Sequence, residues 1–247
     1  GRGQALVSAV ARWLRGHRLP RIATVVFMFL LPLTNVVSAA IVVMTARAAG
    51  RRSAAIDVAA ALLILGALVV LTSGASGAPW PGATALGAGA LWGGSLLGGA
   101  LLRRYGSVDL AVQSRVAGGL VGLILAGLAI PDARAYWQPV LQALIQAAGL
   151  PQVDGLPPGW LATVAALMHG VISASLLSTL ILALMLGLWL DREAGAGDWR
   201  RQFLELRLGR VLSLVTVAAV LLLATGFVSL GGGLLLVLGT GFAAQGL

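Results

Sequence analysis

Long apolar runs alternate with short polar segments along the whole chain. The runs cover 22–46, 54–73, 83–102, 107–130, 160–190 and 211–229, with a shorter run at 231–247. Most of them reach the ~20 residues that a helix needs to cross ~30 Å of hydrocarbon. They are continuous, whereas the strands of a membrane barrel would alternate between apolar and polar positions. The pattern therefore predicts an all-α polytopic membrane bundle of about six or seven transmembrane helices, in a single domain over 1–247.

Three segments outside these runs carry an amphipathic pattern instead. They are 135–150, 198–210 and the N-terminal segment 4–18. In the first, Trp137 and Leu141 fall on one helical face, and Gln138 and Gln142 fall on another. Helices with two such faces lie along the membrane surface or cover the end of a bundle. We expect 135–150 and 198–210 to be two interfacial helices, and the second also offers a docking face for anionic lipid or a cytoplasmic partner.

The composition places most of the chain in lipid. Of its 247 residues, 59% are hydrophobic and 10% are charged, against about 25% charged in soluble domains. The formal net charge of +9 comes from seventeen arginines and no lysine, and almost all of the arginines fall outside the apolar runs. This placement encodes membrane orientation, and no nucleic-acid recognition module accompanies the charge. We therefore expect these charges to meet the lipid bilayer and not nucleic acid.

The arginines between the runs predict which segments face the cytoplasm. Basic segments are 47–53, 103–106 and 191–210, and segments with one arginine or none are 74–82 and 131–159. By the positive-inside rule the basic group is cytoplasmic and the other group lies on the opposite side. The N-terminal segment 1–21 breaks this alternation. It also carries five arginines, yet only one apolar run separates it from the cytoplasmic turn that follows.

The stretch FLLPLTNVVS interrupts that one run, 22–46, with Pro32, Thr34 and Asn35. Proline removes a backbone donor and disrupts the preceding helical turn, and Thr34 and Asn35 are able to bond the carbonyls that it frees. Three interpretations stay open. The run forms a re-entrant dip of two half-length helices, or one kinked span, or 4–14 or residues before this chain contribute another membrane pass.

Three residues that are charged at neutral pH lie within the apolar runs, where a charge costs ~2.5–3.5 kcal/mol on insertion scales. Asp57 and Asp109 are near the starts of their helices, which favour acidic side chains. Arg115 lies deeper. A pair between Asp109 and Arg115 is poor because they are six residues apart, so we consider a bridge from Arg115 to Asp57 on a neighbouring helix. Structural pairing and a substrate or proton role are the two interpretations.

His169 stands nine residues inside the run 160–190, near the bilayer centre, and Ser173 follows one turn later on the same face. A hydrogen bond between helices would explain both residues. Alternatively, His169 converges with Thr34 and Asn35 on a central cavity, because a broken helix beside a polar helix is typical of small-solute sites. The candidate ligand-binding residues are therefore Thr34, Asn35, His169 and Ser173.

The run 83–102 is rich in glycine at helical spacing. Gly89 and Gly93 are four residues apart, as are Gly94 and Gly98. Small residues at this spacing let a neighbouring helix approach closely. The neighbour is either another helix of this chain or a helix of another subunit.

No catalytic constellation is apparent. The absence of Cys excludes disulfides, thiolate metal sites and thiol nucleophiles, and the absence of Lys excludes a phosphate-binding P-loop. The two histidines, His17 and His169, do not make a metal triad, and no HExxH or GxSxG motif occurs. We expect neither enzymatic activity nor a metal or cofactor.

Several stretches together resemble a known family. They are the start GRGQA, a run broken by LP and closed by SAAIVVMTAR, then YWQ, MHGVISASLLSTLILALMLGLWL, FLELRLGR and the final GFAAQGL. In order, and across most of the chain, they resemble the bacterial inner-membrane proteins grouped as domain of unknown function 2232. The chain departs from that family at DREAGAGDWRRQFLELRLGR, where the family has an aromatic WWQ, an NPGGF stretch and an EFHxLRL motif.

The resemblance implies a bacterial inner-membrane protein whose family has no established activity. Some relatives have been likened to the substrate-capture subunits of energy-coupling-factor vitamin transporters, and Ala5 and Ala9 would be a weak echo of their coupling surface. It also implies that the helix over 231–247 continues beyond this chain. We therefore expect a non-enzymatic solute-binding or transport component. The alternative is a structural or assembly subunit that joins other membrane proteins through its glycine-rich span and surface helices.

Overall fold

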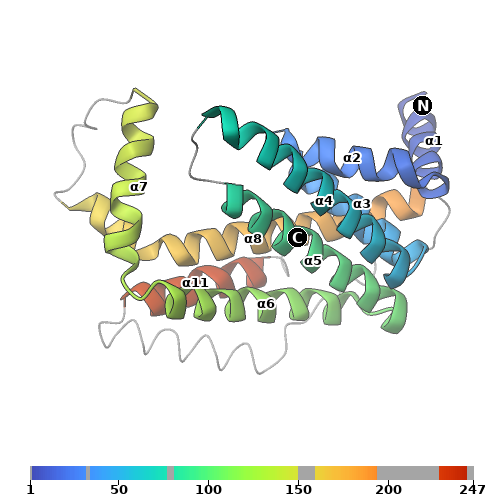
Figure 1. The fold of residues 1–247 in the computed structure, drawn as a ribbon. Coiled ribbons are helices and arrows are strands. Elements are labelled where there is room, and N and C mark those ends of the chain that lie inside the picture. The colour runs from blue at the N-terminus through green and yellow to red at the C-terminus, as the bar shows by residue number, and fades with distance from the viewer. Residues whose placement is uncertain (1, 32–33, 77–80, 150–158, 194–227, 244–247) are drawn as a thin grey trace. The chain divides into compact units, whose positions relative to one another are not determined.

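The computed structural model of the chain describes residues 2–31, 34–76, 81–149, 159–193 and 228–243. Within these ranges the chain forms helices and no strand (Figure 1). The helices are α1 (Arg2–Gly16), α2 (Arg18–Leu30), α3 (Asn35–Ala48), α4 (Arg51–Ser76), α5 (Pro81–Tyr105), α6 (Val108–Ala129), α7 (Ala133–Ala147), α8 (Trp160–Glu193) and α11 (Val228–Ala243). The prediction of an all-α protein is confirmed for the described part of the chain.

The helices fall into two compact units. Unit 1 comprises 1–115, 178–207 and 247, and unit 2 comprises 116–177 and 208–246. The boundary falls after Arg115 in α6 and after Leu177 in α8, so each of these helices contributes to both units. The prediction of one domain over 1–247 stays a prediction.

Four of the described helices are long and apolar enough to cross a membrane. They are Arg51–Thr72, Thr84–Tyr105, Val108–Ala129 and Trp160–Arg192. These helices match four of the predicted apolar runs, and they indicate a membrane protein. The count of six or seven spans stays a prediction. Of the remaining runs, 211–229 lies almost entirely outside the described residues, and 231–247 corresponds to α11, a shorter apolar helix.

The predicted surface helix 135–150 corresponds to α7, in which Asp132 caps the N-terminus by accepting from the Ala135 amide at 2.9 Å. The other predicted surface helix, 198–210, lies outside the described residues. Position at a membrane interface stays a prediction for both.

The run 22–46 is two helices that fold back on one another. The Ser38 hydroxyl in α3 donates to the Val25 carbonyl in α2 at 2.7 Å, although the residues are thirteen apart. In one continuous helix the same groups would be about 20 Å apart. The interpretation as one kinked span is therefore wrong, because the chain reverses direction between α2 and α3. The Thr34 hydroxyl donates to the Met28 carbonyl at 2.6 Å. It therefore provides a hydrogen-bond partner for a carbonyl at the C-terminal end of α2, as expected.

Trp92 of α5 fixes this hairpin from the side. Its ring is fully buried, and its Nε1 donates to Ser38 Oγ at 2.8 Å, so that Trp92, Ser38 and Val25 form one hydrogen-bonded chain across three helices. The ring also packs on Phe29, with centroids 5.1 Å apart. Ser38, a polar residue within the apolar run 22–46, therefore joins α2, α3 and α5.

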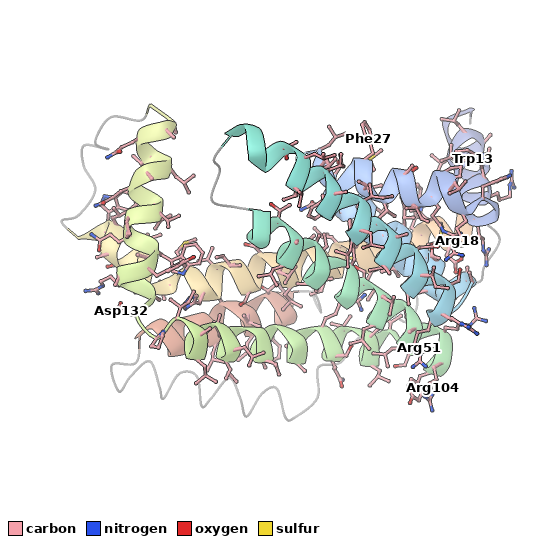
Figure 2. The ribbon with its side chains drawn as sticks, viewed as in Figure 1. Trp13, Arg18, Phe27, Arg51, Arg104 and Asp132 are labelled. Carbon is pink, nitrogen blue, oxygen red and sulfur yellow. The ribbon has the colours of Figure 1, made fainter. Side chains whose placement is uncertain are left out.

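The hairpin brings the arginine-rich segments of unit 1 to one end. Arg18, at the start of α2, binds Asp57 near the start of α4, and Arg47, near the end of α3, binds Asp191 near the end of α8. Figure 2 shows the labelled residues Arg18, Arg51 and Arg104 at this same end. Arg15 and Arg47 both pair with Asp191, and Arg103 donates to the Arg47 carbonyl, so arginines of 1–21, 47–53 and 103–106 lie at one end of unit 1. This placement is consistent with the positive-inside rule for all three segments.

Helix α3 forms the core of unit 1. Nine consecutive residues from Ser38 to Ala46 are buried, which identifies a helix that is covered on every side. Two glycines of neighbouring helices contact its backbone. A Cβ added at Gly99 of α5 would lie 2.6 Å from the Val43 carbonyl oxygen, and one at Gly187 of α8 would lie 2.8 Å from the Ala40 carbonyl oxygen. The backbones are able to approach this closely only because glycine has no side chain.

Candidate functional site

Unit 2 contains a partly open cavity of about 190 Å³ next to His169. Its walls come from the last turns of α6, the connection to α7, the start of α7 and the middle of α8. The lining residues are Leu123, Ile124, Gly127, Leu128, Ile130, Pro131, Ala133 and His169. His169 is the only polar side chain among them. The cavity is therefore an apolar space with one titratable ring at its wall.

The connection between α6 and α7 shapes this cavity. α6 ends at Ala129, and Pro131 cannot continue the helix because it lacks a backbone donor. Asp132 then starts α7 immediately through its cap on Ala135. Because the connection is so short, α7 leaves at a steep angle and runs across the direction of α6 (Figure 1). The chain thus places Trp137, on the second turn of α7, beside α8.

Trp137 and His169 meet at the edge of their rings. Their centroids are 6.1 Å apart with an interplanar angle of 78°, a T-shaped contact. His169 is 8% exposed, and its Nε2 is buried without a hydrogen-bond partner. Trp137 Nε1, which can only donate, is also buried without a partner. Two polar nitrogens thus lie on adjacent rings in an apolar environment.

Close glycine contacts hold α8 in position at His169. A Cβ added at Gly170 would lie 2.3 Å from the Cα of Gly233 in α11, and one added at Gly232 would lie 2.6 Å from Leu167. Backbones that approach so closely leave α8 little freedom to rotate. Because Gly170 follows His169 directly, the contact with α11 fixes the backbone from which the His169 ring extends.

The other predicted ligand-binding residues are not part of this cavity. Ser173 is half-buried on α8, one turn beyond His169, and is absent from the lining. The Thr34 hydroxyl is satisfied by carbonyls of α2, and Asn35 begins α3. Both belong to unit 1 and His169 belongs to unit 2. Their convergence with His169 stays a prediction.

The acidic candidates within the apolar runs differ in their contacts. Asp57 binds Arg18 at 2.6 Å and also Arg21, so the expected bridge from Arg115 to Asp57 is replaced by two arginines of the preceding hairpin. This arrangement was not predicted, because the segment 1–21 was treated as separate from the helix that contains Asp57. Asp109 lies in the first turn of α6, where the helix dipole favours an acid.

The four candidate packing glycines of α5 divide into two pairs. Added Cβ atoms would meet Leu180 at 3.0 Å from Gly94 and the Arg115 guanidinium at 2.0 Å from Gly98. Nothing lies within 4 Å of the same positions at Gly89 and Gly93. Gly94 and Gly98 thus pack within the chain, whereas Gly89 and Gly93 face away from the rest of the described chain.

Two further residues were not singled out as site residues by their sequence positions. Trp137 was placed on the apolar face of the amphipathic segment 135–150, a position that indicates burial or membrane contact and no specific partner. Asp191 was hidden in a charged segment, although it is 2% exposed and lies within ion-pair distance of Arg15 and Arg47. In the described ranges, no group of three His, Asp or Glu side chains is arranged to hold a metal ion.

No protein-family model, curated protein or solved structure matches this chain. The resemblance to the inner-membrane family therefore stays an expectation, and the cavity at His169 has to be interpreted from its own chemistry.

Proposed function

We propose that this protein is a non-enzymatic, polytopic protein of a bacterial inner membrane that binds a small solute in the cavity beside His169, as a solute-binding component of transport. The observation that carries the proposal is the buried His169 Nε2, which lacks a partner at the wall of the cavity; the neighbouring Trp137 Nε1 also lacks a partner but lies outside the described lining. A buried polar group left without a hydrogen bond costs about 1–3 kcal/mol. A solute oxygen in the cavity that accepts from His169 would recover that cost.

The lining indicates the kind of solute. Seven of the eight lining residues are aliphatic, glycine or proline, and none carries a formal charge at neutral pH when His169 is neutral. A strongly charged solute would lose its hydration without gaining a counter-charge. The cavity therefore favours a neutral, mostly apolar molecule of about ten heavy atoms with one hydrogen-bond-accepting oxygen.

The same lining argues against catalysis. General acid–base chemistry needs a group that transfers a proton and a second group that positions or activates the reactant. Among the described lining residues, His169 alone is able to transfer a proton, and none of the others carries a hydroxyl or carboxylate. Binding without chemistry is therefore the better interpretation of this cavity.

Two matched probes test the proposal. Acetophenone and ethylbenzene share a phenyl ring and a two-carbon chain, and only acetophenone carries a carbonyl oxygen. Binding to the protein in phosphatidylcholine nanodiscs is measured by saturation-transfer NMR, with empty nanodiscs to subtract partitioning into lipid. We expect the wild-type protein to prefer acetophenone about tenfold, the value of one added hydrogen bond. His169→Ala and Trp137→Phe should each reduce this preference.

Tyr136→Phe is the control, because Tyr136 is adjacent to Trp137 but is 45% exposed. It should keep the full preference for acetophenone. Equal preference in the wild-type protein and in all three variants would show that the cavity does not bind such a solute.

A specific observation favours a second function, that of an assembly subunit in a larger membrane complex. On α5, Leu86 is 77% exposed and Leu97 is 50% exposed, and they flank the open positions of Gly89 and Gly93. A helix of another membrane protein would pack well on this face. Gly93→Leu should then remove subunits that copurify with the protein in mild detergent, while acetophenone binding stays unchanged.

A further inference from the structure

A second site, separate from the His169 cavity, is indicated by the buried charges of unit 1. In the described part of the chain the buried charged residues are Arg21, Asp57, Arg115 and Asp191. Three of them are in ion pairs: Arg21 with Asp57, and Asp191 with arginines of α1 and α3. Arg115 is 4% exposed and forms no ion pair with the acidic residues that the structure describes. A buried charge without a counter-charge is costly, so a ligand is the expected reason for its persistence.

The position of the Arg115 guanidinium is defined by two helices. Its Nη1 donates to the Ala111 carbonyl at 3.0 Å, one turn earlier on α6. The group lies against Gly98 of α5, in the space that a side chain there would fill, because an added Cβ would be 2.1 Å from Nη2. The side chain thus points toward the start of α6 at Val108, which is the arginine-rich end of unit 1. The guanidinium is about 5 Å inside that helix terminus.

The unused donors of Arg115 are Nε and Nη2, both buried and without a partner. These two atoms form one edge of the guanidinium, and this edge matches the two oxygens of a carboxylate or phosphate. Arg21 in the same unit shows what the edge does when it is occupied. Its Nε and Nη2 both donate to one oxygen of Asp57, Oδ2, with the Nε contact at 2.8 Å, while Arg18 donates to the other oxygen, Oδ1.

We propose that Arg115 binds an oxyanion through Nε and Nη2, and that the ligand is a phosphate group. Ser95, three residues before Gly98 on α5, is fully buried with its hydroxyl also lacking a partner, and it supplies a further donor on this helix. Phosphate is favoured because Arg115 lies near the arginine-rich end of unit 1, and basic residues near the ends of membrane helices recognise phospholipid headgroups. The phosphate belongs either to an anionic lipid or to a free phosphate ion.

The test measures the melting temperature of the protein in phosphatidylcholine nanodiscs. One arm adds sodium phosphate at constant ionic strength, and the other replaces part of the lipid with phosphatidylglycerol. We expect one of the two to raise the melting temperature of the wild-type protein by about 5 °C at a hundredfold excess over Kd. A rise with phosphatidylglycerol alone identifies a lipid headgroup, and a rise with sodium phosphate identifies the free ion.

Three variants separate this site from general electrostatics. Arg115→Gln removes the charge, Arg115→Lys keeps the charge without the planar edge, and Arg104→Gln removes an exposed arginine at the same end of unit 1. We expect the rise to be absent in Arg115→Gln, reduced in Arg115→Lys and unchanged in Arg104→Gln. An equal rise in Arg115→Lys would mean that charge alone acts, which overturns the proposed edge-on site.

A second measurement keeps the proposal testable if the Arg115 variants fail to fold. Native mass spectrometry of the wild-type protein, released from phosphatidylglycerol nanodiscs or from sodium phosphate, should show one retained phospholipid or one retained phosphate. No retained phosphate group, together with no rise in melting temperature in either arm, would overturn the proposal. Because the two sites share no residue, that result would leave the cavity at His169 unaffected.

Discussion

At the residue scale, the burial of an arginine decides how much its ion pair contributes to the free energy of unfolding. Asp57 is bound by two arginines whose surroundings differ: the side chain of Arg21 is 6% exposed and that of Arg18 is 46% exposed. Breaking a buried ion pair leaves a charge in a medium of low dielectric constant, whereas an exposed arginine returns to water. The same carboxylate therefore provides an internal comparison of the two situations.

We expect Arg21→Gln to lower the free energy of unfolding by about 3 kcal/mol, because it leaves Asp57 with a weaker partner in a buried position. Arg18→Gln should lower it by less than about 1 kcal/mol. Both are measured by denaturant unfolding in the same detergent, with Arg18→Gln as the matched control. Equal losses in the two variants would mean that burial does not distinguish these pairs.

At the scale of elements, glycines determine how closely the helices of unit 1 approach. Gly99 on α5 contacts the backbone of α3, whereas the position of Gly89 on the same helix is open. Both residues lie within α5, so glycine lowers the stability of the helix by a similar amount at the two positions. Only their neighbours differ.

We expect Gly99→Ala to destabilise the protein by about 1–3 kcal/mol, because its Cβ would lie 2.6 Å from the Val43 carbonyl oxygen and α3 would have to move. Gly89→Ala should be neutral or stabilise by up to about 1 kcal/mol, since alanine favours the helix. Thermal unfolding of both variants in nanodiscs provides the measurement. A destabilisation by Gly89→Ala as large as that by Gly99→Ala would contradict the contacts assigned to α5.

At the scale of the whole molecule, the α2–α3 hairpin determines which segments lie at the same end of unit 1. Arg18 and Arg21 bind Asp57 near the start of α4, so the end of α1 lies at the same end of unit 1 as the turn after α3. Each hairpin helix has thirteen or fourteen residues and is too short to span the bilayer. We infer that the hairpin dips into the membrane from the cytoplasmic side and returns to it.

Cysteine labelling tests this topology directly, because the chain contains no cysteine of its own. We expect His17→Cys and Arg52→Cys to react with a membrane-impermeant maleimide from the same, cytoplasmic side, as both side chains are exposed. Leu31→Cys, at the far end of α2, is the control and should stay unlabelled from that side, because thiols react slowly out of water. Labelling of His17→Cys and Arg52→Cys from opposite sides would rule out the re-entrant hairpin.

Much of the fold follows from local sequence. Four apolar runs became helices of membrane-spanning length, since the ~20 residues needed to cross hydrocarbon can be counted without knowing any neighbour. Thr34 was expected to satisfy carbonyls beside Pro32, and its hydroxyl does so, because the contact is only six residues long. Local pattern was sufficient for these features because each depends on residues that are close in the chain.

The tertiary structure alone decided how the run 22–46 folds and which charges pair. Ser38 reaches Val25 and Trp92 only when the chain has reversed, so the choice between a hairpin and a kinked span depended on contacts up to 54 residues apart. The apolar pattern by itself determined that this protein belongs in lipid. It did not determine where Trp137 would meet His169, because hydrophobic periodicity reports burial and does not specify the partner across the helix interface.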